Sequence, residues 1–395
     1  MNLSPLAARL MKRKLRMGMV GGGLDAFIGA VHRRAAFLDG KIELVCGAFS
    51  SSPEKSRLAG EAFGIHPHRT YGSFDEMFRK EKNLPGEMRM DFVSIVTPNH
   101  MHFAPAKQAL ENGFHVVLDK PMTWSLAEAK KLRQITNRSK LLMAVTHAYT
   151  GYPMVKEAKS LVASGKLGTI RKVYVEYTQG WLASLVEKKG NKQAAWRTDP
   201  KRSGLGGATG DIGTHAANLA EYITGLRITS LCAQLNQVVK GRKIDDDAAM
   251  LLEFDNKATG VLVATQIASG EENNLRIRVY GEFGGLEWKQ EDSNTLVVKW
   301  ADRPREVLRN GWPYLSAEAK ASTRVPSGHP EGYLEAFANI YSNFATAVID
   351  YKPGKAPSKD CNFPTVEDGF RGMAFIEAAV LSSKSKQKWV TIKTR

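Results

Sequence analysis

Two groups of ionisable residues have the types and spacing needed for proton chemistry. The apolar run 116–118 ends at Lys120, and Asp211 stands four residues before His215. A lysine at a strand end can polarise a hydroxyl, and a carboxylate one helical turn from an imidazole can orient it or share its proton. Each pattern also has a plainer interpretation: Lys120 as a solvated strand end, and the pair as polar groups capping a packed helix. A zinc site needs more ligands than this stretch provides, so we expect no metal.

A functional role for Lys120 is favoured if it follows a strand of a parallel sheet. Run 116–118 follows a probable helix, and Pro121 stops further strand pairing. Ligands of such sheets lie outside the carboxyl ends of the strands. The alternation predicts a doubly wound parallel sheet with right-handed crossovers. Strands are expected at 16–20, 42–49, 91–96, 116–118 and 141–146, and helices up to 37 and at 53–63, 71–79, 104–112 and 125–136.

A glycine-rich turn follows the first of these strands. Gly21, Gly23 and Ala26 form a G-x-G-x-x-A pattern immediately before a helix. In this context Gly21 allows the tight turn, Gly23 leaves room for a pyrophosphate, and Ala26 lets helix and strand pack closely. The helix N-terminus adds partial positive charge, so the turn predicts a dinucleotide site.

The second strand ends in Ser50, Ser51 and Ser52, where an NAD-selective fold usually offers an acid. Serine hydroxyls suit either a ribose hydroxyl or a 2′-phosphate, and Arg57 is near enough in sequence to help with the phosphate. Ser52 also fits as the cap of the next helix. We therefore expect NAD or NADP, with NAD slightly favoured.

After Tyr149 the pattern changes to long alternating runs joined by turns such as Asp255-Asn256 and Gly284-Gly285. Period-two alternation predicts a large, mainly antiparallel sheet in an α+β domain. Its strands are expected at 169–177, 228–239, 248–254, 260–267, 275–280, 295–300 and 389–392, and its helices at 154–164, 209–222, 331–349 and 366–382. The expected division is therefore α/β, with a Rossmann domain at 1–148, a substrate and oligomerisation domain at 149–395, and helix 366–382 packing back on the first.

Composition excludes several classes of protein. The chain has 395 residues with 43% hydrophobic content, which is globular, and no apolar run approaches the roughly 20 residues of a membrane span. The net charge of +16 is scattered without a nucleic-acid module, so we expect no nucleic-acid partner. Three separated cysteines fit buried free thiols. Residues 1–14 lack the order of a secretory signal, which favours a cytoplasmic protein.

Several motifs occur together in a recognisable order. They are Gly21-x-Gly23-x-x-Ala26, Thr97-Pro98-Asn99 with His102, Asp119-Lys120-Pro121, Trp196-Arg197, and Gly206-Gly207 followed by Asp211 and His215. This set resembles the Gfo/Idh/MocA oxidoreductases over nearly the whole chain. Segments 146–153 and 329–333 look like the branch with levoglucosan dehydrogenase and similar glycoside 3-dehydrogenases. Asp119 replaces the family's usual glutamate, and His147-Ala148-Tyr149 replaces its frequent Asn-x-Arg.

The resemblance implies a nicotinamide cofactor, a secondary alcohol of a sugar or cyclitol, and a catalytic set of Lys120, Asp211 and His215. Together with the turn and the serines, it gives as cofactor contacts Gly21, Gly22, Gly23, Leu24, Ser50, Ser51, Arg57, Thr97, Pro98, Asn99, His102, Asp119, Lys120, Trp196 and Arg197. Expected substrate contacts are Lys120, His147, Tyr149, Tyr152, Trp181, Asp211, His215 and His329, although the aromatic residues would equally suit the core.

Three functions remain open from the sequence. The first is a reversible NAD(P)-dependent dehydrogenase that oxidises a sugar, glycoside, anhydrosugar or inositol to a ketone, with carbon 3 the expected position. The second is a redox-neutral enzyme that retains its cofactor and performs elimination or epimerisation through a keto intermediate. The third is a nonenzymatic sugar or dinucleotide sensor. A homo-oligomer, dimer or tetramer, is expected because a large sheet face is left open.

Overall fold

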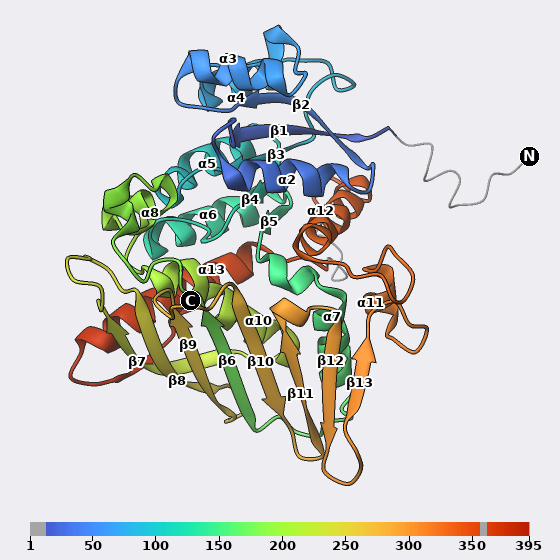
Figure 1. Cartoon of the computed structure of the whole chain (residues 1–395). Coiled ribbons are helices and arrows are strands. Elements are labelled where there is room, and N and C mark those ends of the chain that lie inside the picture. The colour runs from blue at the N-terminus through green and yellow to red at the C-terminus, as the bar shows by residue number, and fades with distance from the viewer. Residues whose placement is uncertain (1–12, 356–361, 395) are drawn as a thin grey trace, which may run out of the picture.

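The computed structural model describes residues 13–355 and 362–394. The interpretation of the first twelve residues and of Cys361 lies outside these ranges. The chain forms two sheets, one above the other in Figure 1, with helices between and around them. Among the described residues, no helix is both long and apolar enough to cross a membrane.

The first sheet is the predicted parallel one, with strand order β2-β1-β3-β4-β5. All its neighbouring strands pair in parallel, which confirms the doubly wound Rossmann arrangement. The central strands β3 and β4 are wholly buried, as expected for a sheet covered on both faces. The strands are β1 (Leu15–Gly21), β2 (Ile42–Ala48), β3 (Phe92–Val96), β4 (His115–Leu118) and β5 (Met143–Val145). The helices are α2 (Phe27–Phe37), α3 (Pro53–Ala62), α4 (Phe74–Lys82), α5 (Phe103–Glu111) and α6 (Leu126–Ser139).

The second sheet has nine strands in the order β13-β12-β11-β10-β6-β9-β8-β7-β14. Only the β6–β9 pair is parallel, so the predicted antiparallel character is confirmed. Buried and more exposed residues alternate along β6 and β8, because one face packs on helices and the other stays open. The strands are β6 (Lys172–Thr178), β7 (Ile228–Asn236), β8 (Asp247–Phe254), β9 (Thr259–Thr265), β10 (Asn274–Tyr280), β11 (Gly284–Lys289), β12 (Thr295–Trp300), β13 (Glu306–Arg309) and β14 (Trp389–Thr391).

Two strands of this sheet were not expected from the sequence. The predicted turn at Gly284-Gly285 is wrong, because β11 begins at Gly284. Gly285 pairs with Tyr280, and a Cβ on Gly285 would lie 2.6 Å from the Tyr280 ring. Glycine therefore makes room for a neighbouring aromatic ring here and does not mark a turn. The short strand β13 was also missed.

Two C-terminal helices connect the domains. The helices of this half are α7 (Pro153–Ala163), α8 (Lys192–Arg197), α9 (Pro200–Ser203), α10 (Thr214–Thr224), α11 (Ala317–Ala321), α12 (Tyr333–Ile349) and α13 (Val366–Lys384). Helix α13 packs on β7 and also on α6 and β5, and α12 packs on α2. Tyr341 of α12 contacts His32 of α2 through its hydroxyl, 2.7 Å from Nδ1. These contacts hold the second sheet against the mouth of the first.

The two described cysteines are free. Cys46 is buried, as expected, and burial raises the pKa of its thiol. Cys232 is only partly buried because it lies on the open side of β7, so the expectation of three buried thiols is wrong for this residue.

Candidate active site

The turn after β1 has the backbone of a dinucleotide cradle. Gly21 and Gly22 have φ of 78° and 70°, in the left-handed region that favours glycine. A Cβ on Gly29 of α2 would lie 2.4 Å from the Gly22 Cα. The close approach of helix and strand is therefore made by Gly22 and Gly29, whereas Ala26, expected to make it, is the N-cap residue of α2.

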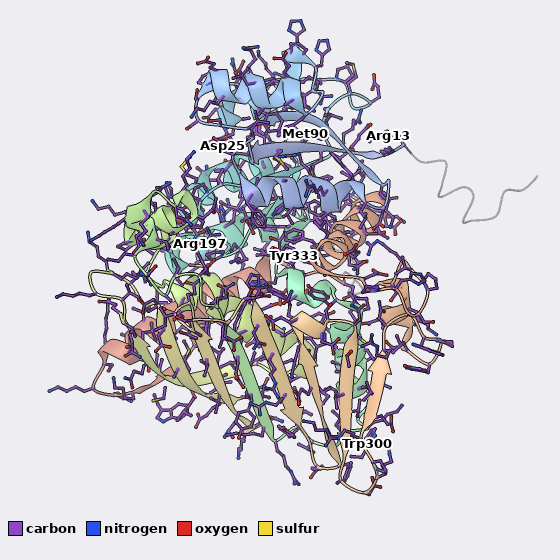
Figure 2. All side chains as sticks on the ribbon, viewed as in Figure 1. Arg13, Asp25, Met90, Arg197, Trp300 and Tyr333 are labelled. Atoms are coloured by element: carbon purple, nitrogen blue, oxygen red, sulfur yellow. The ribbon has the colours of Figure 1, made fainter. Side chains whose placement is uncertain are left out.

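A cleft of about 1400 Å³ begins at this turn and continues between the two sheets. Its walls come from the ends of β2, β3 and β4, from α8, and from the near ends of β6, β10 and β11. Asp25, Arg197 and Tyr333 come from separate parts of the chain and all line the cleft; in Figure 2, Asp25 lies beside the first sheet, and Arg197 and Tyr333 lie lower, between the sheets. Of the expected cofactor contacts, those lining the cleft are Gly21, Gly22, Gly23, Leu24, Ser50, Ser51, Thr97, Pro98, Asn99, Asp119, Lys120, Trp196 and Arg197.

At the end of β2 the structure changes one expected contact. Ser52 caps α3 by accepting a hydrogen bond from the Lys55 amide. Arg57 is outside the cleft, where its guanidinium pairs with Glu61 at 3.4 Å on the exposed side of α3. Lys55 and Arg57 are two residues apart on α3, about half a helical turn, so they face opposite sides, and it is Lys55 that lines the cleft. Lys55 therefore takes the place proposed for Arg57.

His102 is buried and does not line the cleft. Its Nδ1 lies 2.8 Å from the Pro121 carbonyl oxygen and its Nε2 lies 2.8 Å from the Thr97 carbonyl oxygen. The ring thus connects the ends of β3 and β4, so His102 braces the loops that hold the cleft and is not placed to touch a cofactor.

Lys120 and Asp211 form the most densely bonded pair of the cleft. The lysine Nζ donates to the Asp211 carbonyl at 2.6 Å and to its Oδ1 at 2.9 Å. The other carboxylate oxygen receives Gln266 Nε2 at 2.9 Å and lies 3.2 Å from Arg197 Nε. Burial alone would raise the pKa of Asp211, but Lys120 and Arg197 outweigh it and hold this pKa below its usual value. Asp211 is therefore an anion that positions both cations.

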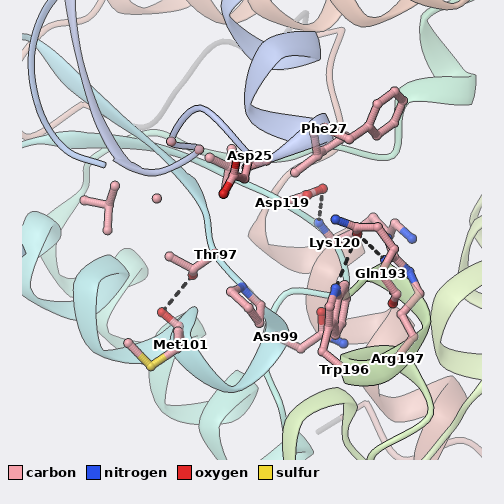
Figure 3. Close-up of a pocket in the computed structure, with 18 of the residues that line it drawn as sticks. Asp25, Phe27, Thr97, Asn99, Met101, Asp119, Lys120, Gln193, Trp196 and Arg197 are labelled. Atoms are coloured by element: carbon pink, nitrogen blue, oxygen red, sulfur yellow. Dashed lines mark hydrogen bonds between the residues drawn. The ribbon is translucent and has the colours of Figure 1, made fainter. Parts of the chain in front are cut away.

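Asp119 holds the backbone of the loop that carries Lys120. Its Oδ1 accepts a hydrogen bond from the Lys120 amide at 2.8 Å (Figure 3). The same oxygen accepts a second from Thr146 Oγ1 at 3.0 Å. Its Oδ2 lies 3.9 Å from the buried His32 Nε2. The side chain thus fixes the loop that carries Lys120.

The helix predicted at 209–222 has an irregular start. Thr209–Gly213 form a π-helical turn, and α10 begins only at Thr214. Asp245 caps this start by accepting the amides of Gly207 and Thr209, both at 2.7 Å. A Cβ on Gly207 would lie 1.9 Å from the Asp245 carbonyl oxygen, so the glycines admit the chain's own segment and do not leave the helix start open to a ligand.

His215 lines the cleft from the first turn of α10. Its Nδ1 lies 3.4 Å from the Nδ1 of His147, and its ring meets the Tyr149 ring edge-on at 4.9 Å. Burial, Lys120 and His147 together hold the pKa of His215 well below its ordinary value, against the opposing effect of Asp211. The imidazole is therefore neutral at pH 7. The carboxylate of Asp211, expected to orient it, is committed to Lys120 and its neighbours.

The wall opposite the Rossmann strands consists of amides and phenols that sequence reasoning largely missed. Asn273 Oδ1 accepts from Tyr177 Oη at 2.8 Å and from Gln179 Nε2 at 2.7 Å. The Asn273 amide donates to Tyr149 Oη at 3.3 Å, and Tyr149 and Tyr177 also share a hydrogen bond. Gln179 accepts from Gln266 at 3.1 Å, which links this wall to Asp211. We call Gln179, Asn273, Gln290, Tyr149 and Tyr177 the polar wall.

Strand register explains why these residues meet. Thr178 pairs with Asn274 and with Thr265, so the residues just beyond them, Gln179, Asn273 and Gln266, lie side by side. The alternating pattern in the sequence predicts where these strands end, but not which strands are neighbours, so it could not show that the three residues meet.

Helix α8 closes one side of the cleft. The guanidinium carbon of Arg197 lies 4.3 Å from the Trp196 ring centre and 6.0 Å from that of Trp181, and all three residues line the cleft. In Figure 3, Trp196 and Arg197 lie beside Lys120. A cation held against aromatic faces forms a rigid cover.

Three expected substrate contacts lie outside the cleft lining. His147 is buried behind His215. Tyr152 is buried too, and its hydroxyl accepts from Gln290 Nε2 at 3.3 Å. His329 is exposed, with Nδ1 3.2 Å from the Pro326 carbonyl oxygen. It lies outside the cleft, so the prediction that it contacts the substrate is wrong. Lys120, Tyr149, Trp181, Asp211 and His215 line the cleft together.

The residues present fit a nicotinamide dinucleotide. The glycine turn leaves no side chain between backbone and cleft, and the exposed Leu24 and Phe27 offer apolar surface beside it. The turn, Thr97 and Asn99 would hold the pyrophosphate and ribose side, and Lys120 lies at the far end. Among the described residues, no group of three or more His, Cys, Asp or Glu side chains could hold a metal ion.

Comparison with known proteins gives the family. Residues 15–147 match the model described as the oxidoreductase family with NAD-binding Rossmann fold (GFO_IDH_MocA), and residues 155–287 match the GFO/IDH/MocA C-terminal domain. The chain belongs to this family. It is therefore an NAD(P)-dependent oxidoreductase by family.

Individual family members resemble it over almost their full length. It is 31% identical to the uncharacterized oxidoreductase YfiI of Bacillus subtilis, covering 98% of each chain. It is 24% identical to levoglucosan dehydrogenase of Pseudarthrobacter phenanthrenivorans, covering 96% of this chain and 98% of the relative. The structure of an inositol dehydrogenase homolog from Azotobacter vinelandii, complexed with NADH and myo-inositol, aligns with TM-score 0.87 and 32% identity over 96% of this chain and 98% of that one.

This Gfo/Idh/MocA member departs from the family pattern at two places, Asp119 and segment 147–149. Asp119 retains the carboxylate that holds the Lys120 loop. The segment 147–149 instead places one imidazole behind His215 and one phenol in the polar wall. The first residue thus holds the Lys120 loop, and the second segment supplies part of the wall around His215.

Proposed function

We propose that this chain is a reversible NAD(P)-dependent dehydrogenase that oxidises a secondary hydroxyl of an uncharged sugar, glycoside, anhydrosugar or inositol to a ketone. The observation that carries the proposal is one continuous cleft in which the glycine turn leads to Lys120, Asp211 and His215. Relatives support the substrate class, since one acts on levoglucosan and another was solved with NADH and myo-inositol. The resemblance of segments 146–153 and 329–333 to glycoside 3-dehydrogenases favours carbon 3 as the position oxidised.

The proposed roles follow from the bonds of each residue. Bound oxidised nicotinamide supplies the hydride acceptor. Lys120 has three N–H donors, two of which go to Asp211, and the third remains for the substrate hydroxyl. His215, neutral at pH 7, accepts the hydroxyl proton. Asp211 acts by fixing Lys120 and Arg197, so we assign it as the anion that orders the site.

The preference for an uncharged substrate follows from the charges. Near the reacting position the cations Lys120 and Arg197 are matched by Asp119 and Asp211. The polar wall carries amides and phenols, which read hydroxyl groups as donors and acceptors. A phosphate or carboxylate beside Lys120 and Arg197 would have to compete with the Asp211 carboxylate, which already pairs with both cations. Anionic sugars should therefore be poor substrates.

We also propose that the protein is a homo-oligomer, a dimer or a tetramer, through the open face of the nine-stranded sheet. Trp389, Cys232, Leu251 and Val261 stand in register across four strands of that sheet. Leu251 and Trp389 are 50% and 41% exposed. Light scattering on Leu251→Asp should show a smaller assembly than the parent.

A cofactor-reduction screen tests the function. Absorbance of the reduced nicotinamide is followed with neutral sugars, glycosides, levoglucosan and inositols, each beside a phosphorylated or carboxylated counterpart. We expect turnover with at least one neutral polyol and reduced cofactor formed in proportion to ketone. An eliminated or epimerised product, formed with no accumulation of reduced cofactor, would identify the redox-neutral alternative. Tight binding of a polyol without any turnover would identify a sensor.

A further inference from the structure

His147 meets His215 on the side away from the cleft. The two Nδ1 atoms lie 3.4 Å apart, and the side chains are 1% and 7% exposed. His147 is firmly held, because its amide donates to the Val145 carbonyl at 2.8 Å and its carbonyl accepts from Thr150 Oγ1 at 2.9 Å. The contact is therefore a fixed feature of the site.

This contact bears on which nitrogen of His215 carries the proton. A neutral imidazole has one N–H and one lone pair, so one ring must donate at Nδ1 and the other must accept there. If His215 donates, its Nε2 keeps a lone pair that can take a proton from a hydroxyl. If it accepts, its Nε2 carries hydrogen and cannot act as a base. The partner at Nδ1 thus decides whether His215 can do its proposed work.

We propose that His147 is a positioning residue that accepts the Nδ1–H of His215 and so fixes the tautomer with a free Nε2. The inference rests on the proposed dehydrogenase function. In the oxidation, the hydroxyl proton passes to His215 Nε2 while the carbinol hydrogen leaves as hydride to the oxidised nicotinamide. The carbonyl double bond forms, and the new imidazolium still donates Nδ1–H to His147.

The surroundings of His147 allow this direction. The pKa of His147 is lowered to about 4 by burial, with Lys120 adding to the effect and Asp368 opposing it, so the ring is neutral and can accept. It does not line the cleft, so it cannot serve as the base itself. The other titratable groups facing the two rings are Lys120, Asp119, Asp211, Asp368, Tyr149 and Tyr177.

A matched pair of substitutions tests the assignment. Asparagine and leucine are close in size and shape, but only asparagine offers an oxygen near the position of Nδ1. We expect His147→Asn to retain kcat within about threefold and His147→Leu to lose roughly tenfold or more, with cofactor affinity unchanged in both. His115→Leu removes another buried imidazole at the far end of β4 and should leave kcat unchanged. Equal kcat in the two His147 variants would overturn the proposal.

Nitrogen-15 NMR of histidine-labelled wild-type protein gives a second test, which does not depend on turnover. We expect the His215 resonances, assigned with His215→Gln, to show a protonated Nδ1 and an unprotonated Nε2. The opposite tautomer would reject the inference. Absence of turnover with every polyol would instead reject the proposed function, and the NMR result would then still report on the contact itself.

Discussion

The two walls of the cleft differ in how the chain builds them. On the Rossmann wall, functional residues follow strand ends in compact motifs, such as Asp119-Lys120 directly after β4. On the opposite wall, Gln179 follows β6, whereas Asn273 and Gln290 flank the β10–β11 hairpin much later in the chain, and strand pairing brings them together. The first wall carries the proposed cofactor site and the second the proposed substrate site, so local motifs can reveal the first whereas the second depends on how the strands pair.

The largest predicted effect is loss of chemistry on removal of the two groups that act on the hydroxyl. Lys120→Met and His215→Ala should each lower kcat by on the order of 10² to 10⁴, while cofactor affinity changes little, because the glycine turn is untouched. Stopped-flow measurement of hydride transfer decides this. A Lys120→Met enzyme that transfers hydride near the parental rate would show that the Rossmann wall has been misassigned.

Lys156, in the C-terminal half of the chain, contrasts with Lys120 of the Rossmann half because its amine is buried without a partner within the described ranges. Unlike Lys120, Lys156 in α7 is fully buried, and its Nζ has no hydrogen-bond partner in the described structure. Burial lowers the pKa of Lys156 to about 7, against 10.5 for the free side chain. Between about pH 7 and pH 10.5 the lysine is protonated in the unfolded chain and neutral in the folded one, so the free energy of unfolding rises with pH. The destabilisation caused by burying Lys156 is therefore largest below about pH 7.

Lys156→Met should therefore stabilise the protein by on the order of 2–4 kcal/mol at pH 6.5 and by clearly less at pH 9.5. Urea unfolding at the two pH values measures the difference. Lys159→Met, on the same helix but only partly buried, is the control and should respond equally at both. A Lys156→Met variant that is destabilised at pH 6.5 would indicate a partner or function for this amine.

The polar wall predicts a smaller and more selective loss. Asn273→Leu keeps the volume but removes the bonds to Tyr177, Gln179 and Tyr149, so kcat/KM for the polyol should fall by roughly 10- to 100-fold with little change for the cofactor. Asn274→Leu is the control, because its side chain bonds Glu271 at the surface. Equal effects of the two variants would remove Asn273 from the recognition surface.

Prediction from the sequence succeeded where function depends on local chain order. The strand, turn and helix around Gly21 could be predicted, as could the delivery of Lys120 by β4, because hydrophobic runs and their breaks define both. The same reasoning missed the polar wall, since no local pattern states that β6 lies between β9 and β10.

Single-residue assignments failed for a related reason. Arg57 and His329 had suitable side chains, but the direction in which each points depends on helix phase and loop path, which composition does not reveal. The π-helical turn at Thr209–Gly213 is likewise capped by Asp245, a residue far along the chain that no local pattern connects with it.

The smallest predicted effect concerns cofactor choice at the end of β2. Both cofactors should be used, with NAD slightly favoured, because Ser50 and Ser51 can bind either ribose form and, in the part of the chain that the structure describes, one cation near them lines the cleft. That cation is Lys55, so Lys55→Met should lower kcat/KM with NADP by up to about tenfold and leave NAD nearly unchanged, since an exposed charge pair contributes about 1 kcal/mol. Arg57→Met is the matched control on the same helix and should change neither ratio, because Arg57 pairs with Glu61 away from the cleft. Steady-state kinetics with both cofactors provides the measurement. A parental preference for NADP beyond about a hundredfold, worth roughly 2.7 kcal/mol, or a larger effect of Arg57→Met than of Lys55→Met, would show that the Rossmann wall selects its cofactor by other contacts.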